Sequence, residues 1–522
     1  MRMINIKRSF IALATLSALV SCDDFLDKLP DNRMELKNKD EVAKLLINAY
    51  PTETSAYLLE TFSDNTDEYI NSAWTEADRF QTEAWSWGEI TANGTGGTPQ
   101  ELWDAYYRAI ASANQAIEYI NAQSDQSAYG AELGEALLCR AFNMFKLAEV
   151  FCPAYDPATA ATSLGVPYPL APEKSIGEIL PRETVEILFR KIDQDLQRGL
   201  PLVTNEYAAP KFHFTLNAAY AFACRFYLNY RKFDQAIEYA GKVLGSNPTS
   251  KLRDWATWKT LSANDQIQPN AYVSSKNPAN LLILPVNSEW GVIAGPYSHG
   301  QKYRHGALIS EKETLESKGP WGTSNSVLGY KVFSNPSLAG HFIRNIPYAF
   351  EYTDVQAGIG YPHAVMVEFS TDKLLMERAE ANALAGNYQA AVDDINAELA
   401  AYQVSGRATL TLDDIVAYYS AIDYYTVENP TVKKEFHTTL VTDMEVQEPL
   451  LQCIAHLSRI LTMHEGHRLQ FVKRYGITME RRSLNASQQL LKVKDTMAAG
   501  DLRLAIQLPN DVISAGVEAN PR

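Results

Sequence analysis

Paired helical segments joined by short turns are the feature that most constrains the fold of this chain. The segments YLNYRKFDQAIEYAGKVL (227–244) and ANALAGNYQAAVDDINAEL (381–399) can be overlaid. Each carries an aromatic residue after its turn, Phe233 or Tyr388, and then an alanine three residues later. Small residues at such positions let two helices cross closely, and this cadence is typical of tetratricopeptide repeats. The pattern predicts a mainly α fold built on a tetratricopeptide-like helical-repeat scaffold.

The rest of the chain divides into further helix pairs and two irregular segments. About four helix pairs are predicted, at residues 101–151, 183–246, 369–403 and 448–475. Residues 62–100 and 250–368 lack helical periodicity and are rich in Trp, Tyr, Gly and Pro. Because long irregular excursions in a compact protein are usually functional, we expect them to form a loop-rich ligand-binding face. Residues 40–522 are predicted to fold as a single composite body.

The N-terminus has the pattern of an export signal. Residues 1–21 begin with basic residues and contain an apolar run from Phe10 to Val20, which is too short for a membrane-spanning helix of about 20 residues. The run ends in LVSC, which resembles a bacterial lipobox, so Cys22 is the predicted lipidation site and residues 22–39 the acylated tether. Several acyl chains on one residue give stable anchoring. A plain secretory signal followed by a chance cysteine is the alternative.

Charge and cysteine content exclude some classes of protein. The 522 residues carry a formal net charge of −15, which becomes −18 when a leader containing Arg2, Lys7 and Arg8 is removed. Nucleic-acid-binding proteins usually have a basic surface, so nucleic acid is not an expected partner. Five cysteines are too few for a disulfide scaffold. The four after Cys22 are expected to be buried free thiols, although a bridge between Cys139 and Cys152 stays open.

Several short motifs, taken in order, make the chain resemble the SusD/RagB family of outer-membrane lipoproteins. The motifs are FLDKLP after Cys22, Trp103 with Tyr107, Ile110 and Asn114, Arg140-Ala141, Gly165-Val166-Pro167, Asp195-Leu196, Arg225 to Leu228, LLMERAEA at 374–381, Glu465-Gly466-His467-Arg468, and LRLAI at 502–506. The resemblance implies four tetratricopeptide-like helix pairs that carry a loop-rich face. It also implies a protein that binds its ligand without catalysis.

The same resemblance implies a function in nutrient uptake. Proteins of this family capture an oligosaccharide, or in some members a peptide, at the cell surface. They sit as a lid over a SusC-like TonB-dependent outer-membrane transporter. Asp23 and Asp24 resemble the signal that exports such lipoproteins to the outer face. The resemblance therefore implies a lipid-anchored protein of the outer membrane that faces the cell exterior.

Aromatic side chains in the irregular segments are the candidate ligand-binding residues. A flat ring packs against the apolar C–H face of a sugar, and polar side chains at the rim bond its hydroxyl groups. The stacking candidates are Trp74, which the resemblance places in a ligand-stacking loop, together with Trp290, Tyr297 and Trp321; the polar candidates are Asn71, Arg79 and Asn325. Each of these rings could instead anchor a loop in the core. Trp103, and at least one of Trp85 and Trp87, are expected in the core.

No catalytic, cofactor or metal site is predicted. The pattern His464-Glu465-Gly466-His467 spaces its histidines by three residues, whereas the H-E-x-x-H zinc motif spaces them by four. We expect Glu465 and Arg468 to pair with neighbouring helices and Gly466 to let a helix approach closely.

Two alternatives come from other classes of protein. A lipid-anchored glycosidase would need two carboxylates about 5–10 Å apart in a cleft. A repeat scaffold for protein assembly would bury Trp74, Trp290 and Trp321 instead of exposing them. The leading hypothesis is oligosaccharide binding and delivery to a partner transporter.

Overall fold

A computed structural model describes residues 36–70, 78–94, 96–173, 179–262, 266–335, 340–405 and 409–522. The predicted signal peptide, Cys22 and most of the predicted tether lie outside these ranges, as do Asn71 and Trp74. Among the described helices, none is both long and apolar enough to cross a membrane.

Helices that pack on one another form the repeat scaffold. They are α6 (Pro99–Asn121), α7 (Gly130–Phe151), α8 (Val185–Gly199), α9 (Leu216–Asn229), α10 (Phe233–Leu244), α16 (Thr371–Leu384), α17 (Tyr388–Tyr402), α18 (Leu412–Ser420) and α19 (Gln447–Leu461). Helix α6 packs on α7, α9 on α10, and α16 on α17, while α10 and α19 both pack against α16. This arrangement confirms the predicted mainly α, tetratricopeptide-like scaffold.

The helix pairing differs from the predicted set in two places. Within 183–246, α8 packs back on α7, and α9 pairs with α10. Within 448–475, α19 pairs with α18, a short helix that the sequence pattern did not predict, while α20 (Arg468–Tyr475) packs on α4 (Ala56–Phe62). Gly466 explains this turn of the chain: it has φ +80°, and a Cβ there would stand 2.8 Å from the Cα of Ala56. The predicted close approach at Gly466 is therefore confirmed, with α4 as the neighbour.

Buried arginine–carboxylate pairs join helices of the scaffold. The guanidinium of Arg140 on α7 donates two hydrogen bonds to Asp195 on α8, with N···O distances of 2.6 and 2.7 Å. Arg225 on α9 bonds Glu377 on α16 at 2.6 Å. A buried charge is costly unless it is paired and fully hydrogen-bonded. These pairs therefore favour one set of helix neighbours over others.

The thiols of Cys139, Cys152, Cys224 and Cys453 are buried and free. The prediction of buried free thiols is confirmed, and Cys139 and Cys152 are not bridged.

Short helices complete the described α elements. They are α3 (Lys39–Leu46), α4, α5 (Arg79–Trp85), α11 (Trp255–Thr260), α12 (Ile267–Tyr272), α13 (Trp290–Ile293), α14 (Ala307–Glu313), α15 (Ser324–Val327), α20 and α21 (Asn510–Ser514). The 3₁₀ turns are η1 (Ile47–Ala49), η2 (Gln126–Tyr129), η3 (Leu200–Leu202), η4 (Pro210–Phe212), η5 (Thr249–Lys251), η6 (Ser298–Gly300) and η7 (Leu502–Leu504).

Small sheets bring distant irregular segments together. One has the order β11 (Leu490–Met497), β10 (Met479–Leu484), β1 (Asp67–Tyr69) and β3 (Tyr303–Arg304), with β1 and β10 parallel. A second, antiparallel sheet has the order β2 (Asn280–Asn287), β9 (Ile359–Ser370) and β8 (Tyr348–Asp354). Two-stranded ladders join β4 (Lys318–Gly319) to β5 (Gly322–Thr323) and β6 (Phe333–Ser334) to β7 (His341–Phe342). Because β1 lies between β3 and β10, the two irregular segments meet beside the C-terminal part of the chain.

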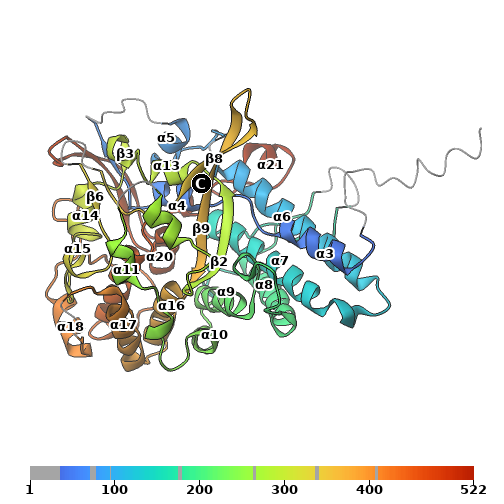
Figure 1. Cartoon of the computed structure of the whole chain (residues 1–522). Helices are drawn as coiled ribbons and strands as arrows, with labels where there is room; N and C mark the ends of the chain where they lie inside the picture. Colours follow the sequence, from blue (N-terminus) through green and yellow to red (C-terminus); the bar gives the residue numbers. More distant parts are fainter. Residues whose placement is uncertain are drawn as a thin grey trace, which may run out of the picture.

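Figure 1 shows where these elements lie. Helices α5 and α13 and the tip of the β8–β9 hairpin are at the top of the view, and α10 and α17 are at the bottom. The irregular segments therefore present one end of the molecule away from these repeat helices.

Candidate functional site

Two aromatic rings are exposed on the β8–β9 hairpin. Phe350 is 46% exposed and Tyr352 is 55% exposed, and their ring centroids lie 4.9 Å apart. Both lie on the same face of β8, because residues two apart on a strand share a face. On the paired strand, a Cβ at Gly360 would stand 2.6 Å from the Phe350 ring. The glycine therefore leaves the space that this ring occupies.

Tyr297 lies in the turn that follows α13. Its ring is 46% exposed, and its backbone N–H donates to the carbonyl of Val292. Helix α13 packs on β8 and β9, and a Cβ at Gly291 would stand 3.1 Å from the Cβ of Tyr348. Tyr348 shares its face of β8 with Phe350 and Tyr352, so α13 rests on that face. We call Tyr297, Phe350 and Tyr352 the hairpin surface.

Trp290 does not present its ring to solvent. Its side chain is only 6% exposed, and its ring stacks on Tyr57 with centroids 4.9 Å apart. Its indole N–H donates to the carbonyl of His464 at 2.7 Å. The expectation of a ring free to stack on sugar does not match this position. Trp290 instead anchors α13, and with it the turn that carries Tyr297.

Trp321 and Asn325 also differ from the expectation of an exposed ligand contact. Trp321 is 3% exposed; its N–H donates to Ser324 Oγ at 3.1 Å, and its ring lies 5.0 Å from His456 on α19. Asn325 is half-buried and donates to Glu316 at 3.1 Å. In Figure 1, α15, which carries Asn325, lies at the left edge, whereas α13 lies at the top. The structure therefore does not bring these two residues together with Tyr297.

Arg79 is exposed at the start of α5. Its Nε donates to Glu83 Oε1 at 2.7 Å, so its side chain is already held at the surface. The preceding residue, Asp78, accepts a hydrogen bond from Tyr57, the ring that stacks on Trp290. Arg79 is thus connected to α13 through Asp78 and Tyr57. The neighbouring candidates Asn71 and Trp74 lie outside the described residues.

The remaining tryptophans of the N-terminal irregular segment are core residues. Trp85 and Trp87 are buried, and their indole N–H groups donate to the carbonyls of Thr66 and Phe62. The sequence predicts that at least one of these two tryptophans lies in the core, and both do. Trp103 is also buried against the core, as expected.

A buried network of charges underlies the irregular segments. Asp64, directly after α4, accepts hydrogen bonds from Arg468 on α20 at 2.7 and 2.8 Å. It also lies 3.5 Å from Arg459 on α19 and 3.7 Å from Lys434. Burial alone would raise the pKa of Asp64, but Arg459 and Arg468 hold it well below the ordinary value. The ionised carboxylate therefore ties the start of the irregular segment to the repeat helices.

Two further carboxylates extend this network. Asp67 on β1 accepts both of its bonds from Arg482 on β10, each at 2.9 Å. Glu313 on α14 lies 2.8 Å from Lys434. Burial lowers the pKa of Lys434 to about 8, with Glu313 opposing the shift. The network thus links α4, β1, α14, α19, α20 and β10 into one rigid support.

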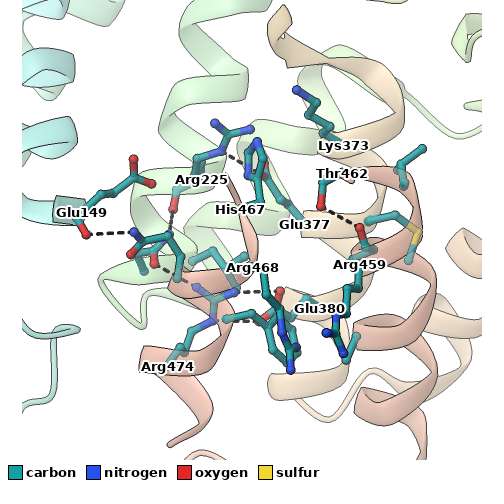
Figure 2. A pocket seen from close by; sticks show the side chains of 18 residues that line it. Glu149, Arg225, Lys373, Glu377, Glu380, Arg459, Thr462, His467, Arg468 and Arg474 are labelled. Atoms are coloured by element: carbon teal, nitrogen blue, oxygen red, sulfur yellow. Dashed lines mark hydrogen bonds and ion pairs between the residues drawn. The ribbon is translucent and has the colours of Figure 1, made fainter. Parts of the chain in front are cut away.

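A small pocket between the scaffold helices is lined by paired charges (Figure 2). Figure 2 shows Arg225 turned toward Glu377, and Arg474 turned toward Glu380. The cavity has a volume of about 80 Å³, whereas pockets for small organic ligands occupy about 300–1,000 Å³. This pocket therefore belongs to the scaffold, and an oligosaccharide does not fit in it.

The His464–His467 segment is structural. Glu465 lies 2.6 Å from Lys373 on α16, and Arg468 pairs with Asp64, as predicted for pairing with neighbouring elements. Burial lowers the pKa of His464 to about 3, so its ring is neutral at physiological pH. Throughout the described ranges, no group of three or more His, Cys, Asp or Glu is placed to hold a metal ion.

Sequence reasoning missed Phe350 and Tyr352. The signal was available in YAFEYTD (348–354), where aromatic residues recur at every second position. Period-2 alternation predicts a strand with its rings on one face. The absence of helical periodicity in the long stretch around it predicts a loop here, and the structure has a strand instead.

Known proteins are similar to this chain in the sequence of its N-terminal part and in the fold of nearly the whole chain. The family model described as "Starch-binding associating with outer membrane" matches residues 24–228. No curated protein matches the chain. A SusD superfamily protein from Bacteroides thetaiotaomicron has 16% identity and a TM-score of 0.62, covering 93% of this chain and 100% of its own. A putative sugar binding protein from Bacteroides vulgatus has 17% identity and a TM-score of 0.62, covering 94% and 99%. A laminarin binding SusD-like protein has 15% identity and a TM-score of 0.51, covering 93% and 100%.

The solved structures share the fold along nearly the whole chain, and the family model matches its N-terminal part. The chain is therefore similar to SusD-like proteins in the sequence of residues 24–228 and in its fold.

Proposed function

We propose that this protein captures a nutrient oligosaccharide on the hairpin surface, without catalysis, and passes it to a SusC-like TonB-dependent transporter. The observation that carries the proposal is the exposed aromatic pair Phe350–Tyr352 on a hairpin that α13 supports. Tyr297 supplies a third ring near the base of the hairpin. Trp74, Asn71 and Arg79 are proposed to complete the surface from the segment around α5.

The physical basis is stacking on a flat surface. Sugar rings have apolar C–H faces that pack on aromatic rings, and each hydroxyl bond at the rim adds about 0.5–1.5 kcal/mol net. A shallow surface leaves much of the ligand in water, so we expect dissociation constants in the micromolar to millimolar range, or about −8 to −4 kcal/mol. Such affinity suits capture followed by release to a second protein.

Phe350→Ala/Tyr352→Ala is expected to weaken binding to a polysaccharide about tenfold, a loss of about 1.4 kcal/mol. The test is retardation of the protein in native gels that contain soluble starch or laminarin. Phe212→Ala, which removes another partly exposed ring, is the matched control and should leave retardation unchanged. Equal retardation of all three proteins on every glycan that binds would place the ligand elsewhere. Binding to casein peptides and to no glycan would favour the peptide-capturing alternative.

We further propose that the mature chain is anchored in the outer membrane, facing the exterior, through acyl groups on Cys22. The support is the lipobox-like LVSC after a short apolar run, and the family's association with the outer membrane. In cells fed labelled palmitate, wild-type protein should carry the label and sediment with outer membranes. Cys22→Ser should lose both properties, and Cys453→Ala, which changes a buried thiol, should keep them. Label on Cys22→Ser would exclude this anchor.

A further inference from the structure

The far end of the β8–β9 hairpin stands clear of the rest of the molecule. Every residue from Ala349 to Ile359 is exposed, and Figure 1 shows this end projecting at the top of the view. Val355 and Ile359 are its aliphatic residues, and they are 78% and 60% exposed. Among the described residues, no large apolar side chain is more exposed than Val355. We call residues 354–359 the hairpin tip.

The turn at the hairpin tip is held by its own hydrogen bonds. Oδ1 of Asp354 accepts from the backbone N–H groups of Gln356 and Ala357, each at 2.9 Å. The hydroxyl of Thr353 donates to the carbonyl of Ile359 at 3.2 Å, which joins the two strands. Aspartate side chains commonly fix turns in this way. The tip therefore presents its apolar side chains in a set shape, and a partner that binds it has little chain to order.

The aliphatic side chains of the tip suit a protein partner and not a sugar. Sugars pack on flat aromatic rings, as proposed for Phe350 and Tyr352. Val355 and Ile359 are branched chains without a flat face, and such side chains gain most when a pocket of matching shape removes them from water. Two of them on one fixed turn also differ from a single scattered apolar residue, which needs no explanation. The chemistry of the tip therefore fits the surface of another protein.

The charge of the hairpin limits which protein surface can receive it. Residues 348–363 contain Glu351 and Asp354 but no lysine or arginine. Both carboxylates lie in the exposed stretch. Opposite charges across an interface favour the correct partner and its orientation, whereas like charges reject a wrong one. The surface that matches this hairpin is therefore an apolar pocket with basic residues at its rim.

The place of the tip relative to the hairpin surface indicates which protein it meets. A protein that hands a sugar to a transporter has to turn its sugar-binding rings toward that transporter. Phe350 and Tyr352 precede Asp354 on β8 by four and two residues, so the tip lies about 7–14 Å beyond them at 3.4 Å per residue. In that orientation the tip reaches the transporter.

We propose that the hairpin tip docks into an apolar pocket with a basic rim on the extracellular side of the partner transporter. The proposal rests on the proposed function, because the transporter is the partner given there. It adds the element that makes the contact and the chemistry of the surface that receives it. Docking of the tip would hold the hairpin surface toward the transporter while the sugar is transferred.

Photocrosslinking in cells that produce the full-length chain together with its transporter tests this contact. With p-benzoylphenylalanine in place of Val355, irradiation should link the chain to the transporter. The same probe in place of Glu238 should not, because Glu238 is an exposed residue of α10, at the opposite end of the view in Figure 1. Crosslinks from position 355 only to a second copy of the chain, or only to lipid, would overturn the proposal.

Co-purification supplies an independent measurement on the same cells. Val355→Ser/Ile359→Ser should reduce the amount of transporter recovered with the chain several-fold and leave retardation in starch or laminarin gels unchanged. Glu351→Lys should also reduce recovery, because it places a positive charge against the basic rim. The control Val404→Ser/Met444→Ser, which changes exposed apolar side chains elsewhere, should recover as much transporter as wild type.

These outcomes separate this inference from the proposed function. If the transporter is recovered equally with wild type and with both hairpin variants, the tip is not the contact, and the proposed function stands. If Val355→Ser/Ile359→Ser loses glycan retardation, the tip belongs to the sugar-binding surface, which also overturns the inference. If wild type recovers no transporter, transfer to a transporter fails, and the inference fails with it.

Discussion

Replacing Asp64 with asparagine is expected to lower the free energy of unfolding by about 3–5 kcal/mol, because it leaves buried cations without their counter-charge. Arg468 donates two hydrogen bonds to this carboxylate, and Arg459 and Lys434 lie within 4 Å of it. The amide keeps the shape of the side chain but removes the charge and one acceptor. Urea unfolding followed by tryptophan fluorescence measures the loss.

The pH dependence of this loss has a definite sign. The pKa of Asp64 is held below its ordinary value by Arg459 and Arg468 against the effect of burial. Its contribution is therefore fully present above the unfolded-state pKa of about 3.9 and disappears as pH falls through the lower folded-state pKa. The difference between wild type and Asp64→Asn should stay constant from neutral pH down to about this value, and close only below it.

An exposed ion pair provides the matched control for Asp64. Glu238 lies 2.8 Å from Lys242 on α10, and both side chains are largely in solvent. Pairs of this kind contribute about 0–1 kcal/mol, so Glu238→Gln should change little. A similar small effect of Asp64→Asn would mean that water or structural relaxation compensates the buried cations, and that the network does not hold the irregular segments rigid.

The repeat scaffold could be predicted because its signals are local. The turn at 231–233 and the small residues after Phe233 and Tyr388 depend only on neighbouring residues, and α9–α10 and α16–α17 follow them. The motif residues that carry the family resemblance also have a physical role. Arg140 and Asp195, and likewise Arg225 and Glu377, are partners across helix interfaces. The order of these motifs along the sequence therefore reflects which helices pack on each other.

The candidate site was harder to predict because burial of a loop tryptophan depends on distant residues. Trp290 is covered by Tyr57 and bonded to the carbonyl of His464. Tyr57 precedes Trp290 by more than 230 residues, and His464 follows it by more than 170. No local pattern at 290 reports these contacts. The exposed rings at 350 and 352 instead had a local signal, their period-2 spacing, which a search for helical periodicity does not detect.

Trp290→Ala is expected to lower the free energy of unfolding by about 3–5 kcal/mol, the usual cost of truncating a buried large aromatic side chain. The truncation removes the stack on Tyr57 and leaves the carbonyl of His464 without its donor. Trp290→Phe keeps most of the volume and should cost about 1–3 kcal/mol, the penalty for an unsatisfied buried acceptor. Urea unfolding of the two variants measures both values.

Comparison with Tyr297→Ala separates an anchoring ring from a ligand-stacking ring. Tyr297 is 46% exposed, so its truncation should change stability by no more than about 0.5 kcal/mol, as for most surface substitutions, and should reduce retardation in starch or laminarin gels. Trp290→Phe should show the reverse: reduced stability with retardation close to that of wild type, because α13 keeps its position. If Trp290→Ala left stability unchanged and abolished glycan retardation, the ring would be a ligand contact, and α13 would have to turn outward to expose it. The buried stack on Tyr57 and the hydrogen bond to His464 oppose that movement, which is why we assign Trp290 to the support of the hairpin surface.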